Sequence, residues 1–289
     1  MKNLRIYVII FLLSFASGTV FSQQLSGDSW SKIKANGSGE VTITYNFSGE
    51  FMKKGPSGLE GLCYQIYSEF IKYVEAKHGV NIKTNIHYPK DPVDFTAFLN
   101  SVKNGKGGVF GLADVTITEE RKNIVQFSPS FFSNVSILLT NNSVPELNNF
   151  NNIDEAFAGM TLIVQRGTTH EKRAYEIKKN LYPNLKIEVV NSFEACYQKV
   201  NESDQYFTYL DFSSYLTAMK QVRNIKRHQA GDKTGESFGL IMPKNSDWSP
   251  LMKEFFEKEG GFTNSNTYKK MVANTLGTHV VAMLNSINQ

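Results

Sequence analysis

Hydrophobic and polar residues follow two rhythms through the first half of this 289-residue chain. Residues 41–45 alternate and are rich in β-branched side chains, which is typical of a strand. Residues 62–75 carry apolar side chains four positions apart, which predicts an amphipathic helix. Further strands are expected at 80–88 and 109–117, with a helix at 94–102 between them. This order of strands and helices predicts a buried, largely parallel sheet.

An asparagine-rich stretch, residues 141–152, interrupts this order and is expected to be a linker. The alternation of strands and helices then begins again and continues toward the C-terminus. Two such halves predict an α/β protein with a ligand cleft between the halves. We expect strands at 135–140, 161–165, 186–190, 206–210 and 238–242, and terminal helices at 249–258 and 268–285.

The first 22 residues have the features of a secretory signal peptide. Lys2 and Arg5 form a basic start, residues 7–16 are almost wholly apolar, and small residues precede the expected cleavage site. A membrane anchor is the alternative, but the apolar run is shorter than the roughly 20 residues that span a bilayer. No cysteine follows the run, so we expect no bacterial lipid anchor. The mature protein would begin near Gln23.

The composition narrows the class of protein. With 41% hydrophobic and 20% charged residues, the chain is globular rather than disordered or coiled-coil. The net charge of +4 comes from basic residues that form no dense cluster, so nucleic-acid binding is not expected. Two cysteines, Cys63 and Cys196, exclude a disulfide scaffold, and we expect two buried free thiols in different lobes. No two histidines have helical metal-ligand spacing, so neither a metal nor a cofactor is expected.

One stretch, residues 114–121, combines the features of an anion site. A predicted strand runs into Thr116 and Thr118, and a helix is expected to begin at Glu119. The N-terminus of a helix offers free N–H groups and a partial positive charge. Arg121 adds a planar fork of donors that matches a carboxylate. The plainer interpretation is an N-capping Thr118 with Arg121 in a surface ion pair.

Two further stretches place polar residues at the ends of predicted strands. Gly167 follows one strand and is succeeded by Thr168 and Thr169, whose hydroxyls begin a helix. Asp211 closes another strand. Each stretch alone is often no more than a helix cap. Ligands of open α/β sheets bind at the carboxyl ends of strands, so the shared position of these stretches favours a binding site.

With these residues the chain resembles the family 3 periplasmic solute-binding proteins, the polar amino-acid receptors of ABC importers. The family pattern is T-I-T-x-x-R, a phenylalanine–serine pair, a glycine–threonine turn and an aspartate that closes a later strand. Here the pattern corresponds to Thr116 to Arg121, Phe127-Ser128, Gly167-Thr168 and Asp211, in the family's order. The resemblance spans nearly the whole mature chain. It implies a type II periplasmic-binding-protein fold, in which two lobes, each a largely parallel sheet flanked by helices, are joined by two hinge strands.

The resemblance also implies an organisation and a role for the whole chain. Residues 23–138 with 241–289 would form the first lobe, and residues 139–240 the second. The strands at 136–140 and 238–242 would cross between the lobes as the hinge. The protein would be a periplasmic monomer without enzymatic activity, which captures an amino acid or similar small zwitterion for delivery to the membrane subunits of an ABC importer.

The same resemblance assigns roles to individual residues. Arg121 would clamp the ligand α-carboxylate with help from the hydroxyl of Thr116. Thr169, together with the N–H groups of its turn, would take that carboxylate from the second lobe. Asp211 would hold the α-ammonium, and Phe95 would pack on the ligand side chain. A zwitterion needs one anion site and one cation site at matching distance, because buried charges are tolerated only when they are paired.

Some residues depart from the family pattern and leave the ligand unidentified. Asp114 stands where small or hydroxyl residues are common. It would give the ammonium a second carboxylate, select a basic side chain, or make an internal hydrogen bond to its loop. Arg166 and His170 flank the opposite wall and would instead favour an acidic side chain.

Two other functions fit the same scaffold. One is an exported enzyme that resembles the cyclohexadienyl dehydratases, with Asp114 or Glu119 as general acid and Arg166 as an extra cation. The charge of Asp211 argues against this enzyme, because it disfavours a dicarboxylate that has no amine. The other is a ligand-loaded partner of a membrane sensor.

Overall fold

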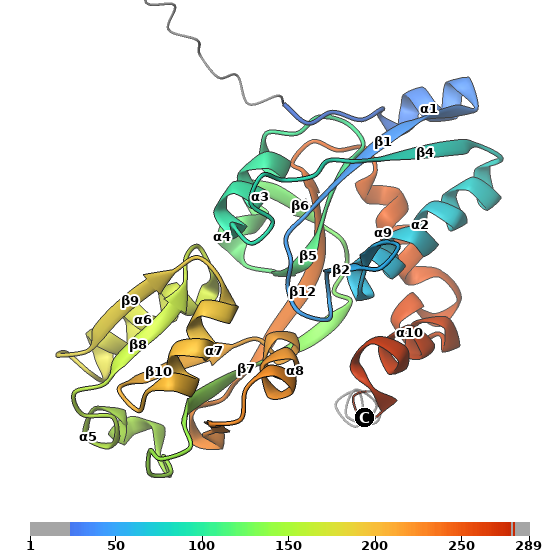
Figure 1. The fold of residues 1–289 in the computed structure, drawn as a ribbon. Coiled ribbons are helices and arrows are strands. Elements are labelled where there is room, and N and C mark those ends of the chain that lie inside the picture. Colours follow the sequence, from blue (N-terminus) through green and yellow to red (C-terminus); the bar gives the residue numbers. More distant parts are fainter. Residues whose placement is uncertain (1–23, 279, 281–289) are drawn as a thin grey trace, which may run out of the picture.

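The computed structural model describes residues 24–278 and residue 280. Its main strands follow the order β4-β1-β5-β12-β7-β10-β8-β9, with β11 beside β7 and β6 beside β12. The long strands β7 (Phe132–Asn141) and β12 (Lys233–Pro243) lie at the centre of this order. A group of parallel strands lies on either side of them, and each group carries its own helices (Figure 1). The predicted two-lobed α/β fold is therefore confirmed.

The first lobe is defined here by three parallel strands and the helices that cover them. One core cluster, beneath α3, contains Phe98 and Val115. A second, larger cluster on the other face contains Phe70, Phe110 and Phe255. The strands are β1 (Ser38–Tyr45), β4 (Asn81–Ile86) and β5 (Val109–Thr116). The helices are α2 (Leu62–His78), α3 (Phe95–Lys103), α9 (Ser249–Glu257) and α10 (Asn266–Leu276).

The second lobe repeats this arrangement with three parallel strands. Phe157 and Phe207 pack in the core on one face of its sheet, and Tyr197 and Leu210 pack on the other. The strands are β8 (Thr161–Gln165), β9 (Lys186–Val190) and β10 (Tyr206–Leu210). The helices are α5 (Ile153–Ala156), α6 (Thr169–Asn180), α7 (Phe193–Glu202) and α8 (Phe212–Gln221).

Strands β7 and β12 connect the lobes, as predicted, but they cross slightly earlier than expected. Residues 137–140 of β7 pair with β10 inside the second lobe. Residues 238–241 of β12 pair with β5 inside the first lobe. The two strands pair with each other through residues 132–136 and 233–238, which therefore form the crossover. The lobe boundaries at residues 138/139 and 240/241 stay a prediction.

The element predictions succeed where the periodic pattern is strong. The three parallel strands of the second lobe have the predicted bounds. The predicted terminal helix 268–285 is interrupted within the described residues. α10 ends at Leu276, Gly277 adopts a positive φ of 99° that a helix does not contain, and Thr278 and Val280 are helical again. Most of the rest of that prediction, and the predicted signal peptide, lie outside the described residues. Several short elements were not predicted, namely α1 (Trp30–Asn36), β2 (Lys53–Gly55), β3 (Gly58–Glu60), β6 (Val125–Phe127) and β11 (Ile225–Arg227).

Both cysteines are buried and free, as predicted, with Cys63 in α2 and Cys196 in α7. Because they belong to the cores of different lobes, they are too far apart in the fold to form a disulfide with each other.

In the part of the chain that the structure describes, no helix combines the length and the apolar character needed to cross a bilayer. Residues 24–278 also contain four short 3₁₀ segments, at Phe150–Asn152, Gln229–Gly231, Lys258–Gly260 and Phe262–Asn264.

Candidate functional site between the lobes

A small cavity, called the inner cavity here, lies where the two lobes meet. It is placed at the carboxyl ends of β5, β8 and β10, as expected for a ligand site in this class of sheet. Its volume of about 20 Å³ leaves room for about one water molecule. The lining residues are Asn46, Phe47, Ser48, Phe95, Asp114, Thr116, Arg121, Gln165, Thr168, Thr169, Phe193 and Asp211.

Among the residues given a role at the site, Phe95, Asp114, Thr116, Arg121, Thr168, Thr169 and Asp211 line this cavity. Arg166 and His170, expected on the opposite wall, do not, and His170 is instead buried beside Asp211. The side chain of Arg166 is exposed and belongs to the lining of neither cavity described here. Its neighbour Gln165 is buried and points inward, and successive side chains of a strand point to opposite sides. The structure therefore gives no contact that would let Arg166 select a ligand side chain.

Arg121 is a buried cation that neutral groups hold in place. It lies on α4 (Glu119–Lys122), whose N-cap Thr118 accepts a hydrogen bond from the backbone N–H of Arg121 at 3.2 Å. The capping interpretation is thus confirmed. The surface ion pair is wrong, because Arg121 is only 9% exposed and makes no ion pair with a described residue.

The guanidinium of Arg121 instead contacts two carbonyls and a ring. Its Nη1 donates to the Thr116 carbonyl at 3.0 Å, and its Nη2 donates to the Gly167 carbonyl across the cleft at 3.2 Å. Its Cζ lies 4.7 Å from the centroid of the Phe95 ring. Burial lowers the pKa of Arg121 to about 10, so the side chain remains charged at neutral pH. A buried cation without a carboxylate partner is well suited to bind the carboxylate of a ligand.

Asp211 is held by a polar network that reaches the hinge strands. Its Oδ1 accepts from Asn134 Nδ2 at 2.6 Å and lies 3.2 Å from His170 Nε2. Asn134, on β7, also donates to Glu236 on β12 at 3.1 Å, and Arg173 Nη2 donates to Glu236 at 2.8 Å. Burial by itself raises the pKa of Asp211, but His170, Asn134 and Arg173 outweigh burial and hold it below its usual value. Asp211 is therefore an ionised carboxylate in a fixed position.

Asp114 brings a second carboxyl group to the inner cavity, from the opposite lobe. Burial and the nearby charge of Asp211 raise the pKa of Asp114 to about 8, so it is largely protonated at neutral pH. Its Oδ2 accepts a hydrogen bond from Ser213 Oγ, at the start of α8, at 3.1 Å. This bond joins the two lobes and is not the internal loop bond considered for Asp114.

The turn before α6 brings its backbone against the first lobe. Gly167 has a φ of 75°, and a Cβ atom there would lie 2.5 Å from Thr96 Oγ1. Only glycine satisfies both the backbone conformation and this close approach. Thr168 then caps α6, and the first N–H groups of a helix have no partner within it. Thr168 and Thr169 thus place a helix N-terminus beside Arg121.

Further contacts join the lobes around the cavity. Gln165 Nε2 donates to the carbonyl of Val93 at 3.1 Å. Two ion pairs also connect the lobes, one between Lys220 and Glu50, the other between Lys172 and Glu120. In each pair the lysine Nζ lies 2.6 Å from a carboxylate oxygen. The side chains of the second pair are mostly exposed, so water screens their attraction.

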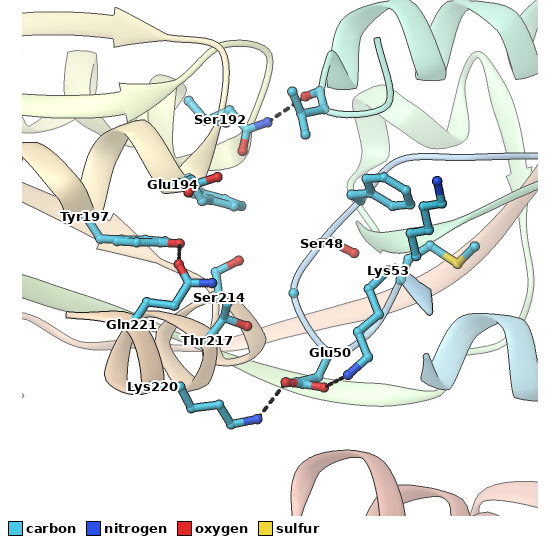
Figure 2. Close-up of a pocket in the computed structure, with 17 residues that line it drawn as sticks. Ser48, Glu50, Lys53, Ser192, Glu194, Tyr197, Ser214, Thr217, Lys220 and Gln221 are labelled. Atoms are coloured by element: carbon cyan, nitrogen blue, oxygen red, sulfur yellow. Dashed lines mark hydrogen bonds and ion pairs between the residues drawn. The ribbon is translucent and has the colours of Figure 1, made fainter. Parts of the chain in front are cut away.

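A second, larger space, called the outer chamber here, adjoins the inner cavity and has a volume of about 520 Å³. Phe47, Ser48, Gln165 and Phe193 line both spaces, so the two spaces are neighbours. Figure 2 shows its walls, with α7 and α8 of the second lobe facing the loop after β1. The remaining lining residues are Gly49, Glu50, Met52, Lys53, Lys54, Val93, Ser192, Glu194, Tyr197, Ser214, Thr217, Lys220 and Gln221.

The family resemblance implies that the loop at residues 46–56 supplies part of the side-chain pocket, and residues 47–50 and 52–54 line this chamber. The wall that α7 and α8 contribute, and the network behind Asp211, were not predicted from the sequence. Asn134 and Glu236 lie in parts of β7 and β12 that contain several other polar residues, so no local pattern distinguished them as members of a network.

Comparison with known proteins supports the fold. No family model and no curated protein matches the sequence. A substrate-binding protein of an ABC uptake transporter from Streptococcus pneumoniae, with bound histidine, is 19% identical with a TM-score of 0.66, covering 86% of this chain and 96% of that one. An ancestral arginine-binding protein bound to arginine is 22% identical with a TM-score of 0.63, covering 82% and 98%.

A binding component of an ABC transporter from Wolinella succinogenes, described as putative and complexed with lysine, is 17% identical with a TM-score of 0.64. That alignment covers 82% of this chain and 95% of the other. At these identities the likeness establishes a shared architecture. The chain has the two-lobed fold of type II periplasmic binding proteins, and the named structures are binding proteins rather than enzymes.

Proposed function

We propose that this protein is an extracytoplasmic solute-binding protein that captures an amino acid or similar small zwitterion between its lobes and delivers it to an ABC importer. The main observation is the charge pattern of the inner cavity. A buried arginine without an acidic partner and an ionised aspartate line the same cavity, and they come from opposite lobes. That is the pair of sites a zwitterion requires.

Each charge of the ligand has a defined partner in this proposal. Arg121 and the hydroxyl of Thr116 bind the α-carboxylate from the first lobe. The start of α6, with Thr169, binds the same carboxylate from the second lobe, because helix N-termini attract anions. Asp211 binds the α-ammonium through Oδ2, since Asn134 and His170 contact its Oδ1.

The ligand also explains why the lobes would close. Neither lobe alone satisfies both charges, so a zwitterion gains contacts only in the closed arrangement. The inner cavity is too small for an amino-acid head as it stands. Binding must therefore replace the bond between Arg121 and the Gly167 carbonyl with bonds to the ligand carboxylate. The crossover of β7 and β12 is the natural hinge for this motion.

The N-terminal residues and the comparisons support the proposed cellular role. The first 22 residues are proposed to direct export to the periplasm and to be removed. The structures of similar fold include ABC transporter binding proteins with histidine or lysine bound. A monomer without enzymatic activity is the state expected of such a carrier.

A thermal-shift screen of the mature protein tests this proposal. The protein, from Gln23 onward, is unfolded and refolded to remove carried-over ligand, then heated with each standard L-amino acid. A ligand at about 100 times its Kd adds roughly 2.7 kcal/mol to the stability. That raises Tm by several degrees in a protein of this size. A folded sample whose Tm no amino acid raises would refute the proposal.

An exported enzyme that resembles the cyclohexadienyl dehydratases is the second candidate function, and one observation favours it. Asp114 is largely protonated near neutral pH, and a general acid needs that property. The reaction would be the dehydration of a cyclohexadienyl acid, as in the exported dehydratases. Turnover of such a substrate, abolished by Asp114→Asn, would favour the enzyme. No turnover, together with an amino-acid Tm shift, would exclude it.

A further inference from the structure

The outer chamber is much larger than the side chain of a free amino acid needs. Its volume of about 520 Å³ falls in the range of pockets that hold drug-sized ligands. It shares four lining residues with the inner cavity, and its walls come from both lobes, so it is the space that a longer ligand could reach from the inner cavity. Figure 2 shows the open space between the two walls, with the Glu50–Lys220 ion pair along one edge.

The junction of the two spaces holds a polar atom without a partner. Ser48 is 5% exposed, and its Oγ makes no hydrogen bond with any described residue. Its hydroxyl lies near enough to the carboxyl group of Asp114 to lower the pKa of that carboxyl. Buried hydroxyls almost always have a partner. Ser48 can therefore bind either this carboxyl group or a polar ligand group at the junction, beyond the α-ammonium and α-carboxylate.

The charged residues of the chamber divide into two sets. Glu50 is neutralised by Lys53 at 2.5 Å and by Lys220 at 2.6 Å. Lys54, on β2 of the first lobe, and Glu194, on α7 of the second, make no ion pair within the described residues. One exposed cation and one exposed anion thus stand on opposite walls of the chamber.

The rest of the chamber wall suits an aliphatic chain interrupted by an amide. Phe47 and Phe193 lie at the junction, and Tyr197 follows on α7. The hydroxyl of Tyr197 donates to Gln221 Oε1 at 2.5 Å, so the side-chain amide N–H groups of Gln221 remain available. Aromatic faces pack against methylene groups, while such amide and hydroxyl groups bind a peptide carbonyl.

We propose that the ligand is a side-chain-linked dipeptide, in which one free α-amino-acid end occupies the inner cavity and the second occupies the outer chamber. This inference rests on the proposed function and names its substrate class. The isopeptide bond lies near Ser48 and the aromatic junction. Lys54 binds the distal carboxylate, and Glu194 binds the distal ammonium. An ordinary α-linked dipeptide does not fit, because its ammonium and carboxylate belong to different residues.

Isothermal titration of the refolded mature protein tests the inference with four probes. These are Nε-(γ-L-glutamyl)-L-lysine, its α-linked isomer L-glutamyl-L-lysine, free L-glutamine and free L-lysine. We expect the isopeptide to bind at least tenfold more tightly than each of the other three. Equal or tighter binding of a free amino acid or of the α-linked isomer would overturn the inference and leave the proposed function standing. Binding of no probe, together with a flat amino-acid screen, would overturn both.

Three variants locate the distal end of the ligand. Glu194 is exposed on the first turn of α7, so Glu194→Gln and Glu194→Trp leave the core intact. Glu194→Gln should weaken isopeptide binding severalfold, and Glu194→Trp should weaken it by tenfold or more by filling the chamber. Neither should alter the affinity for a free amino acid. Lys54→Gln should also weaken isopeptide binding severalfold. Its matched control is Lys34→Gln, which changes an exposed lysine at the end of α1 and should leave binding unchanged. Unchanged isopeptide affinity in all three chamber variants would refute the placement.

Discussion

The two lobes hold their charged groups in different ways. In the first lobe, Arg121 is fixed by backbone carbonyls and by the ring of Phe95, and one of its bonds crosses to the other lobe. In the second lobe, Asp211 is fixed by Asn134 and His170, which belong to a network that reaches both hinge strands. The cation is thus held partly by a bond across the cleft, while the anion is held by a network that continues into the hinge strands.

In the proposed function, this difference gives the lobes separate tasks. The bond between Arg121 and Gly167 would break when a carboxylate enters, so Arg121 would couple ligand binding to the arrangement of the lobes. Asp211, whose Oδ1 is held by Asn134, would act as a fixed point next to the hinge. Pre-organised groups lose less free energy on binding than mobile ones.

The largest effect is expected for Arg121→Ala. Removing one partner of a buried, hydrogen-bonded charge pair costs about 2–5 kcal/mol, which corresponds to a loss of affinity of about 30- to 3,000-fold. Calorimetric titration with the ligand found in the screen measures it. Arg121→Lys should recover only part of the affinity, because an ammonium lacks the planar fork. Arg223→Ala, an exposed arginine on the second lobe, is the matched control. Normal binding by a folded Arg121→Ala protein would show that the anion site is elsewhere.

A smaller effect is expected for Asp211→Asn. The amide keeps the shape of the side chain but removes its charge, and Asp114 supplies a second carboxyl group to the same cavity. We therefore expect affinity to fall by about 10- to 100-fold, equivalent to about 1.4–2.8 kcal/mol. The double variant Asp114→Asn/Asp211→Asn should lose more than the sum of the single losses, because each carboxylate compensates for the other. Strict additivity of the two losses would contradict a shared cation site.

The smallest effect concerns stability and pH. Asp114 has a pKa of about 8 in the folded protein, above the ordinary value of 3.8. Between these values the folded state binds more protons than the unfolded state, so the stability contributed by this group falls as pH rises. The Asp114→Asn variant does not lose this stability, because an asparagine side chain does not ionise. The Tm of the variant should match the wild type near pH 4 and exceed it by a few degrees near pH 9. A constant Tm difference across this range would show that Asp114 is ionised throughout.

Local sequence patterns determined much of the fold. Residues 161–165, 186–190 and 206–210 are short apolar strands bounded by turn residues, and the structure places all three with the predicted bounds. Thr118 and Thr168 act as helix caps, as their positions suggested. Such features depend on residues a few positions apart, so they can be predicted from short stretches of the sequence. The grouping of the predicted site residues followed from a general rule, because parallel strands end at one edge of a sheet.

Other features of the site were decided only by the tertiary structure. Asp114 and Asp211 are almost a hundred residues apart, and their mutual effect on pKa depends on how the lobes meet. The exposure of Arg166, next to an inward-facing Gln165, depends on the side to which one strand end points. The outer chamber depends on a loop, a helix end and a helix face that no local pattern connects. Distances between lobes are set by the hinge and by packing, which no short stretch of sequence encodes.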